Sequence, residues 1–212
     1  MTKIKKYNFS LTGASAMITE TLIIAKEYDR LKDWKEVENS IKENNLLMKI
    51  KDSTFKREFA EIKKRLLTLN HEQLDLLING DLDETKAIIF LSLVKTYTFF
   101  FDFINEVIRN KYLMFDYIVS VSDYIKFFNT KSLSHDELNN ISDKTSKKVK
   151  QVIFKLMEQV GIITNIKNGS IIKPMISDAV IEAIIKDNSE YLSVFFYQKE
   201  EIIQMHNNTK YA

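Results

Sequence analysis

The chain has 212 residues, 45% of them hydrophobic, which is enough for one large domain or for two or three small ones. One proline and four glycines favour long helices and argue against an all-β sandwich. Cysteine is absent, which excludes disulfides and thiolate metal sites, and a net charge of +2 does not by itself indicate a nucleic-acid partner.

Three helices are predicted in the first third of the chain. Residues 14–31 have a helical period of apolar side chains, Asp33 with Glu36 would cap the next helix, and a third helix covers 54–69. The third helix places Phe55, Phe59, Ile62, Leu66 and Leu69 on one face, opposite Lys56, Arg57, Lys63 and Lys64, with Arg65 on the flank. This outline resembles a helix-turn-helix, and the alternative is a three-helix bundle with a solvated basic face.

The middle of the chain is predicted to be an apolar helical scaffold. Asn70 with Gln73 would cap a short helix, Asp81 with Glu84 would cap a long helix reaching about residue 110, and another helix covers 112–128. Residues 87–104 are apolar enough to suggest a membrane span. Lys95 and Asp102 within that segment favour a buried core helix, so no membrane association is expected.

The C-terminal third has the pattern of a winged helix. Ser134 with Glu137 predicts a capping box that opens a helix at 136–141, and a longer amphipathic helix follows and ends before Gly161. Asn168-Gly169 between two runs rich in isoleucine predicts a β-hairpin closed by Pro174. Further helices are predicted at 179–185 and 191–205.

The start of that amphipathic helix is the main candidate site. Its outward side chains are Lys144, Thr145, Ser146, Lys147, Lys148 and Gln151, and Lys167 lies on the predicted hairpin. A helix N-terminus offers free amides and a positive dipole to phosphate, which makes double-stranded DNA the expected partner. The alternative is a module of the same shape used for protein contact.

No catalytic constellation is found. His71, His135 and His206 are scattered, and no glycine-rich phosphate loop occurs, so the sequence predicts neither an enzyme nor a cofactor or small-molecule substrate. The N-terminal residues lack the apolar segment of a signal peptide, and a cytoplasmic location is expected.

Several short patterns together resemble the BrxA family of the BREX bacteriophage-exclusion systems of bacteria. They are Tyr7-x-Phe9-Ser10-Leu11-Thr12-Gly13, Asp33-Trp34, Glu43-Asn44-Asn45-Leu46-Leu47, Arg57-Glu58 with Glu61-Ile62 and Arg65-Leu66, and Asp143-Lys144-Thr145 with Lys148-Val149 and Gln151-Val152-Ile153-Phe154-Lys155. The resemblance covers about residues 7–175.

The resemblance implies an all-α protein with a NusB-like multi-helix core, a helix-turn-helix-like N-terminal part and a C-terminal winged helix. It also implies binding to double-stranded DNA and action with other BREX proteins in phage defence. We expect residues 1–75, 76–133 and 134–212 to form the N-terminal domain, the scaffold and the winged-helix domain. The alternative function is a protein-protein adaptor of the BREX complex with little DNA affinity.

Overall fold

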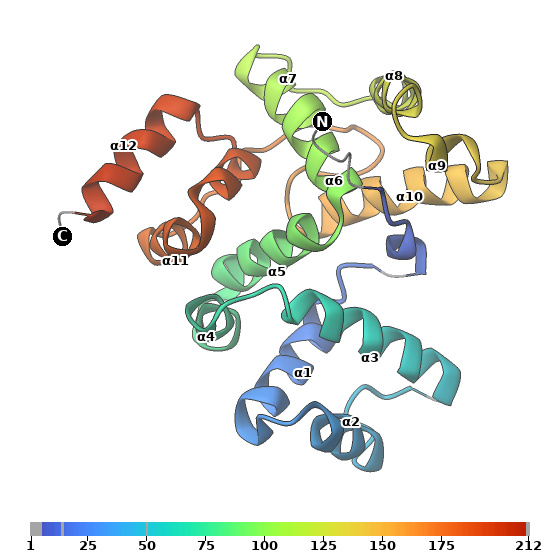
Figure 1. Cartoon of the computed structure of the whole chain (residues 1–212), viewed down its shortest axis with the longest axis vertical. Helices are drawn as coiled ribbons and strands as arrows, with labels where there is room; N and C mark the ends of the chain where they lie inside the picture. The colour runs from blue at the N-terminus through green and yellow to red at the C-terminus, as the bar shows by residue number, and fades with distance from the viewer. Residues whose placement is uncertain (1–5, 14, 50, 211–212) are drawn as a thin grey trace.

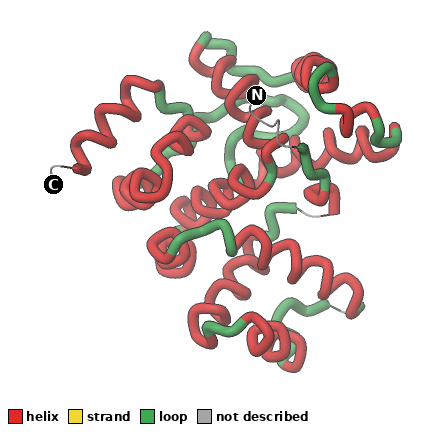
Figure 2. Tube along the Cα trace, viewed as in Figure 1, coloured by secondary structure: helices red, strands yellow, loops and turns green. Residues whose placement is uncertain are grey.

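The computed structural model describes residues 6–13, 15–49 and 51–210, and helices dominate this part of the chain (Figures 1 and 2). The elements in order are η1 (Ser10–Gly13), α1 (Ile18–Leu31), α2 (Trp34–Glu43), α3 (Asp52–Leu66), α4 (His71–Asn79), α5 (Leu82–Thr96), α6 (Thr98–Phe103), η2 (Ile104–Arg109), α7 (Asn110–Leu113), α8 (Val121–Ser132), α9 (Asp136–Asn139), α10 (Asp143–Gln159), α11 (Asp178–Asn188), η3 (Ser189–Phe195) and α12 (Lys199–Lys210). The prediction of an all-α protein is confirmed.

Helix α5 is the centre of the core, and it lies between the N-terminal helices α1–α4 and the rest of the chain (Figure 1). Residues 87–94 of this helix are all buried. Capping boxes form at Asn70 with Gln73 and at Asp81 with Glu84, as predicted, because each box needs only side chains three residues apart.

The prediction of one long helix reaching about residue 110 is wrong, because the chain bends by 110° between α5 and the helical segment that follows. Tyr97 at the bend has an extended backbone with φ −118°. Its hydroxyl donates a hydrogen bond to Glu61 of α3 and accepts one from Nε of Arg65 at 3.1 Å. Burial raises the pKa of the Tyr97 hydroxyl, which therefore stays protonated and remains a donor.

Arg65 is not on the flank of α3, as the sequence suggested, but fully buried. Its guanidinium also donates to the carbonyls of Ser15 and Ala16, at 3.0 and 3.3 Å. A lone arginine in an amphipathic period gives no local sign of burial, since its partners lie at least 32 residues away along the chain.

Three boundaries in the second half also differ from the prediction. The helix expected at 112–128 is interrupted after Leu113, and α8 starts only at Val121, where Ser120 and Asp123 form a capping box. Ser134 does not cap α9, because Glu137 instead accepts hydrogen bonds from the backbone of Tyr7 at 2.6 Å and interacts with His135 at 3.0 Å. The helix expected at 191–205 is divided into η3 and α12 by Phe196, which has a left-handed φ of 66°.

The predicted β-hairpin does not form regular strands in the described part of the chain. Residues 162–172 form a narrow loop with one isolated bridge, between Ile163 and Ile171, and a second bridge joins Ile118 to Ser170. The Ile172 amide donates to the Ile162 carbonyl at 2.9 Å. The turn residues behave as the sequence indicated, since Gly161 and Gly169 both have positive φ angles, +81° and +63°.

Gly169 permits a close approach that no other residue would allow. A Cβ atom there would lie 2.1 Å from the carbonyl oxygen of Val119, whereas a Cβ at Gly161 would meet nothing within 4 Å. The contact joins the loop to residues 117–119, because the Val119 amide donates to the Gly169 carbonyl at 2.9 Å.

We expect Gly169→Ala to lower the free energy of unfolding by about 2–4 kcal/mol, since it adds a steric clash to left-handed strain. Gly161→Ala is the matched control, because it adds the strain alone and should cost about 1–2 kcal/mol. Urea unfolding followed by circular dichroism measures both, and equal losses would show that the Val119 contact is unimportant.

Candidate nucleic-acid interface

Helix α10 presents the candidate site on its outer face. Ser142 caps the helix by accepting a hydrogen bond from the Thr145 amide at 3.2 Å. Val149, Ile153, Leu156 and Met157 are fully buried, which fixes the rotation of the helix. The opposite face carries the exposed side chains of Lys144, Lys147, Lys148, Gln151 and Lys155, which we call the α10 lysine face.

The first turns of α10 border a depression of about 520 Å³ lined by Lys144, Thr145, Lys147, Lys148 and Gln151. Five of the predicted site residues are therefore gathered at one place. Thr145 is less available than the lysines, since its hydroxyl lies 3.0 Å from that of Ser142 within the cap. Ser146 is half-buried and lies on the side of the helix facing away from the lysines.

The lysines of the α10 lysine face lack acidic partners. No ion pair joins Lys144, Lys147, Lys148 or Lys155 to any carboxylate in the described ranges. Their positive charge is thus not neutralised by any described residue and is open to an external anion.

The basic residues of α3 are mostly engaged within the chain. Lys56 pairs with Asp52 at 3.0 Å, and Lys63 lies 5.2 Å from the centre of the Trp34 ring. Lys64 donates to the Ser10 hydroxyl at 2.8 Å and lies 3.8 Å from Glu61. Arg57 alone of the four is exposed with no ion pair to a described residue.

Lys167 is exposed near the tip of the 162–172 loop. The loop is held along α10, because Glu158 accepts a hydrogen bond from the Ile166 amide at 3.0 Å. Glu158 lies 14 residues after Lys144, which is about 21 Å along a helix axis. The predicted residues therefore form three groups, on α3, at the start of α10 and on the loop.

One residue of the lysine face was missed from the sequence. Lys155 follows Gln151 by four residues and Lys148 by seven, so it lies on the same stripe as the predicted side chains. This helical spacing was the signal that could have found it. Lys173, which follows the 162–172 loop, instead makes a cation–π contact, with its Nζ 4.5 Å from the centre of the Tyr197 ring.

The described residues form neither a metal site nor a single membrane-spanning helix. No group of three or more histidine, aspartate or glutamate side chains is placed to hold a metal ion in the described ranges. No single described helix is long and apolar enough to cross a membrane, and α5 with the segment that follows meets that criterion only as a bent pair.

The fold and the site define an all-helical protein in which the exposed lysines of α10 form no ion pair with a described residue. The profile of the BrxA family matches residues 5–188, and the chain belongs to this family.

Curated relatives carry the name BREX protein BrxA. The relative from Bacillus cereus is 29% identical over 155 residues, covering 72% of this chain and 76% of the relative. The relative from Paramagnetospirillum magneticum is 23% identical over 191 residues, covering 88% and 94%. The crystal structure of an uncharacterized protein from Magnetospirillum magneticum superposes with a TM-score of 0.77 at 20% identity, covering 90% of this chain and 98% of that one, so the two share a fold.

The different engagement of the two helices predicts different effects on stability. We expect Lys147→Glu/Lys148→Glu to change the melting temperature by less than about 2 °C, since both side chains are exposed and unpaired. Lys64→Glu should lower the free energy of unfolding by about 1–2 kcal/mol, because it removes the Ser10 hydrogen bond and places a carboxylate beside Glu61. Thermal unfolding followed by circular dichroism measures both, and a larger loss for the α10 pair would contradict the assignment.

Proposed function

We propose that the chain is a non-enzymatic DNA-binding component of a BREX phage-defence system, acting with other BREX proteins. The α10 lysine face would contact the phosphate backbone of double-stranded DNA. The observation that carries the proposal is that these lysines have no acidic partner within the described residues, whereas those of α3 are largely engaged. The BREX part rests on the family and on the names of its curated members.

The geometry suits phosphate contact better than base reading. Lys144, Lys148, Gln151 and Lys155 follow one stripe, and from first to last it extends about 16 Å along the axis at 1.5 Å per residue. Such a stripe can follow the edge of a groove about 12 Å wide. It contains lysine and no arginine, and lysine acts as a point charge on phosphate, whereas the bidentate contacts that discriminate guanine are made best by arginine.

The order of elements supports a winged-helix mode of binding. The extended residues 117–119, helix α8, helix α10 and the paired segments 162–164 and 170–172 come in the order of the parts of a winged helix, with the short helix α9 inserted between α8 and α10. In this arrangement α10 would be the helix placed against DNA, and Lys167 on the loop would reach the neighbouring backbone as a positioning contact.

Charge reversal on α10 tests the proposal. Lys147→Glu/Lys148→Glu should weaken binding to a random-sequence duplex by at least about tenfold. It should also reduce the slope of log K against log salt by about 2, since each phosphate contact contributes about 0.9. Mobility-shift or fluorescence-anisotropy titrations at several salt concentrations measure both quantities.

The matched control is Lys26→Glu/Lys199→Glu, which makes the same change in net charge at two exposed lysines on α1 and α12. It should reduce affinity much less than the α10 pair. If the two double variants bind alike, the α10 lysine face is not the contact. If the wild-type protein binds duplex DNA without salt dependence, or not at all, the adaptor function replaces DNA binding.

A second pair of substitutions asks whether α3 contributes. Lys56→Glu/Arg57→Glu should weaken duplex binding by no more than about threefold, because Lys56 is already paired with Asp52. The same titrations measure the effect. A loss as large as that of the α10 pair would place α3 in the interface on equal terms.

A further inference from the structure

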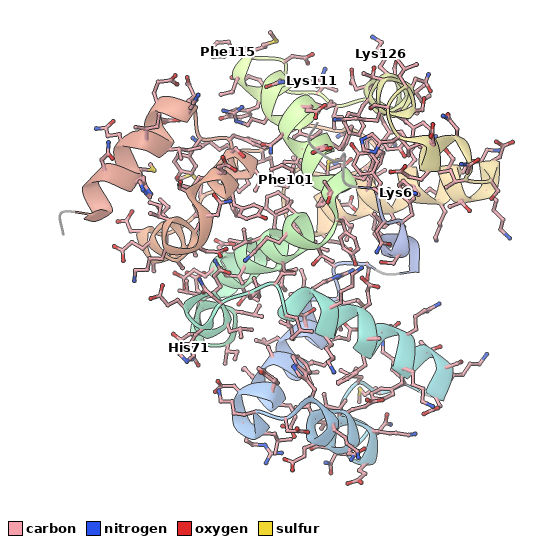
Figure 3. All side chains as sticks on the ribbon, viewed as in Figure 1. Lys6, His71, Phe101, Lys111, Phe115 and Lys126 are labelled. Atoms are coloured by element: carbon pink, nitrogen blue, oxygen red, sulfur yellow. The ribbon has the colours of Figure 1, made fainter. Side chains whose placement is uncertain are left out.

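An apolar surface lies along the link between α7 and α8 and the start of α8. Six of the fifteen large hydrophobic side chains that are exposed in the described ranges fall within residues 114–125. They are Met114, Phe115, Tyr117, Ile118, Val121 and Ile125, and we call them the α7–α8 apolar face. In Figure 3 Phe115 and Lys126 both point outward at the edge of the molecule remote from α3. Clustered exposed apolar side chains mark interaction sites, whereas single ones do not.

Phe115 has a backbone conformation that is unfavourable for a residue with a side chain. It follows the end of α7 with a left-handed φ of 59°, at a position where glycine is the usual residue. The Asp116 amide donates to the Lys111 carbonyl at 2.9 Å, which completes the helix end. Phe115 is nonetheless 81% exposed, and its one ring contact among the described residues is with Tyr117, with the ring centres 6.4 Å apart. The backbone strain at Phe115 is therefore not offset by packing of its ring against the described residues.

Beside Phe115 the backbone has an open edge. Tyr117 accepts a hydrogen bond from the Ile171 amide at 2.8 Å, and Val119 donates to Gly169, so both of these residues bond toward the loop. In an extended segment the residue between them directs its backbone groups the other way. The Ile118 amide meets only its neighbour Asp116 at a long 3.4 Å, and its carbonyl accepts no hydrogen bond from a described residue.

The charges around the face suit a second copy of the same surface. Lys111 is paired with Asp116 and lies 3.5 Å from Asp123, so identical faces would meet without strong repulsion between their centres. Asp116 remains more than half exposed, and Lys126 is exposed with no ion pair to a described residue. Each face thus carries both an accessible acid and a free base at its rim. Lys126 is a single unpaired cation here, against the four unpaired lysines of the α10 lysine face, which disfavours DNA as the occupant.

We propose that the α7–α8 apolar face is a self-association surface that binds a second copy of this chain about a twofold axis near Ile118. Antiparallel pairing about such an axis is self-complementary, because the same residue of each copy donates to and accepts from its counterpart. Phe115, Ile118 and the exposed side of α8 from both copies then bury one another. This contact does not depend on DNA binding.

Sedimentation velocity and light scattering on the full chain test the proposal. The protein is treated with nuclease and kept at high salt, so that bridging by nucleic acid cannot contribute. The measured mass should rise toward twice that of one chain over about a hundredfold range of concentration. Phe115→Gly and Ile118→Glu should each weaken association by at least about tenfold, the first by removing the ring and the second by opposing like charges across the axis.

Met48→Gly is the matched control. Met48 also has a left-handed φ, 52°, and is 85% exposed, but it lies in the link between α2 and α3. Both glycine variants should raise the melting temperature by about 2–4 °C by relieving the same strain. Only Phe115→Gly should weaken association. A wild-type protein that stays monomeric, or a dimer unaffected by both Phe115→Gly and Ile118→Glu, overturns the proposal.

Discussion

The buried guanidinium of Arg65 is the interaction on which the arrangement of the chain depends. Removing a cation from water costs several kcal/mol unless hydrogen bonds replace the lost hydration. Here the hydroxyl of Tyr97 accepts from Nε, and the carbonyls of Ser15 and Ala16 accept from Nη1, whereas Nη2 has no partner among the described residues. Helix α3, the bend after α5 and the N-terminal segment must therefore all be in place for these hydrogen bonds to form.

The N-terminal segment extends the same frame to α10. The Ala16 amide donates to the side chain of Gln159, the last residue of α10, at 2.9 Å. Farther along, the hydroxyl of Tyr7 donates to Asp102 at 2.6 Å and its ring stacks on His135, 3.8 Å away. Residues 7–13 and 15–16 thus connect α3 with α9 and α10, and Lys64 joins this connection through its hydrogen bond to Ser10. Lys64 therefore stabilises the contact between α3 and the N-terminal segment and is less available to an external partner.

Local chemistry made part of the fold predictable. The caps at Asp33, Asn70 and Asp81 and the left-handed Gly161 each depend on neighbours within four residues, and the structure has all of them. The errors arise where a distant partner competes. Glu137 could have closed a box with Ser134, but the Tyr7 amide, 130 residues away, takes its carboxylate. The bend at Tyr97 has the same origin. The apolar sequence around Tyr97 does not indicate that its hydroxyl bonds to Glu61 and Arg65 on α3.

In the candidate site, too, the local pattern was predictable from the sequence and the distant partners were not. Both α3 and α10 read as basic amphipathic helices, and periodicity found the outward lysines of each. What periodicity could not find was the partner of each lysine. Asp52, the partner of Lys56, lies on the same helix, but Ser10 and Trp34, the partners of Lys64 and Lys63, lie on other segments. The number of lysines on a helix face is therefore a poor measure of charge available to a partner, and the number without an internal acid is a better one.

The lysine face and the apolar face are both costly to leave exposed, one through repulsion between like charges and the other through unfavourable hydration. They are also built on one short stretch of backbone pairing. Residues 117–119 form the open edge on one side, and on the other they hold the 169–171 segment, whose loop is bonded to α10 through Glu158. The Gly169–Val119 approach lies at one end of this pairing and needs a residue without a side chain at position 169. The orientation of the two surfaces relative to each other thus depends on a few backbone hydrogen bonds rather than on a regular sheet, together with the core contact of α8 with α10, where the ring centres of Tyr124 and Phe154 lie 6.4 Å apart.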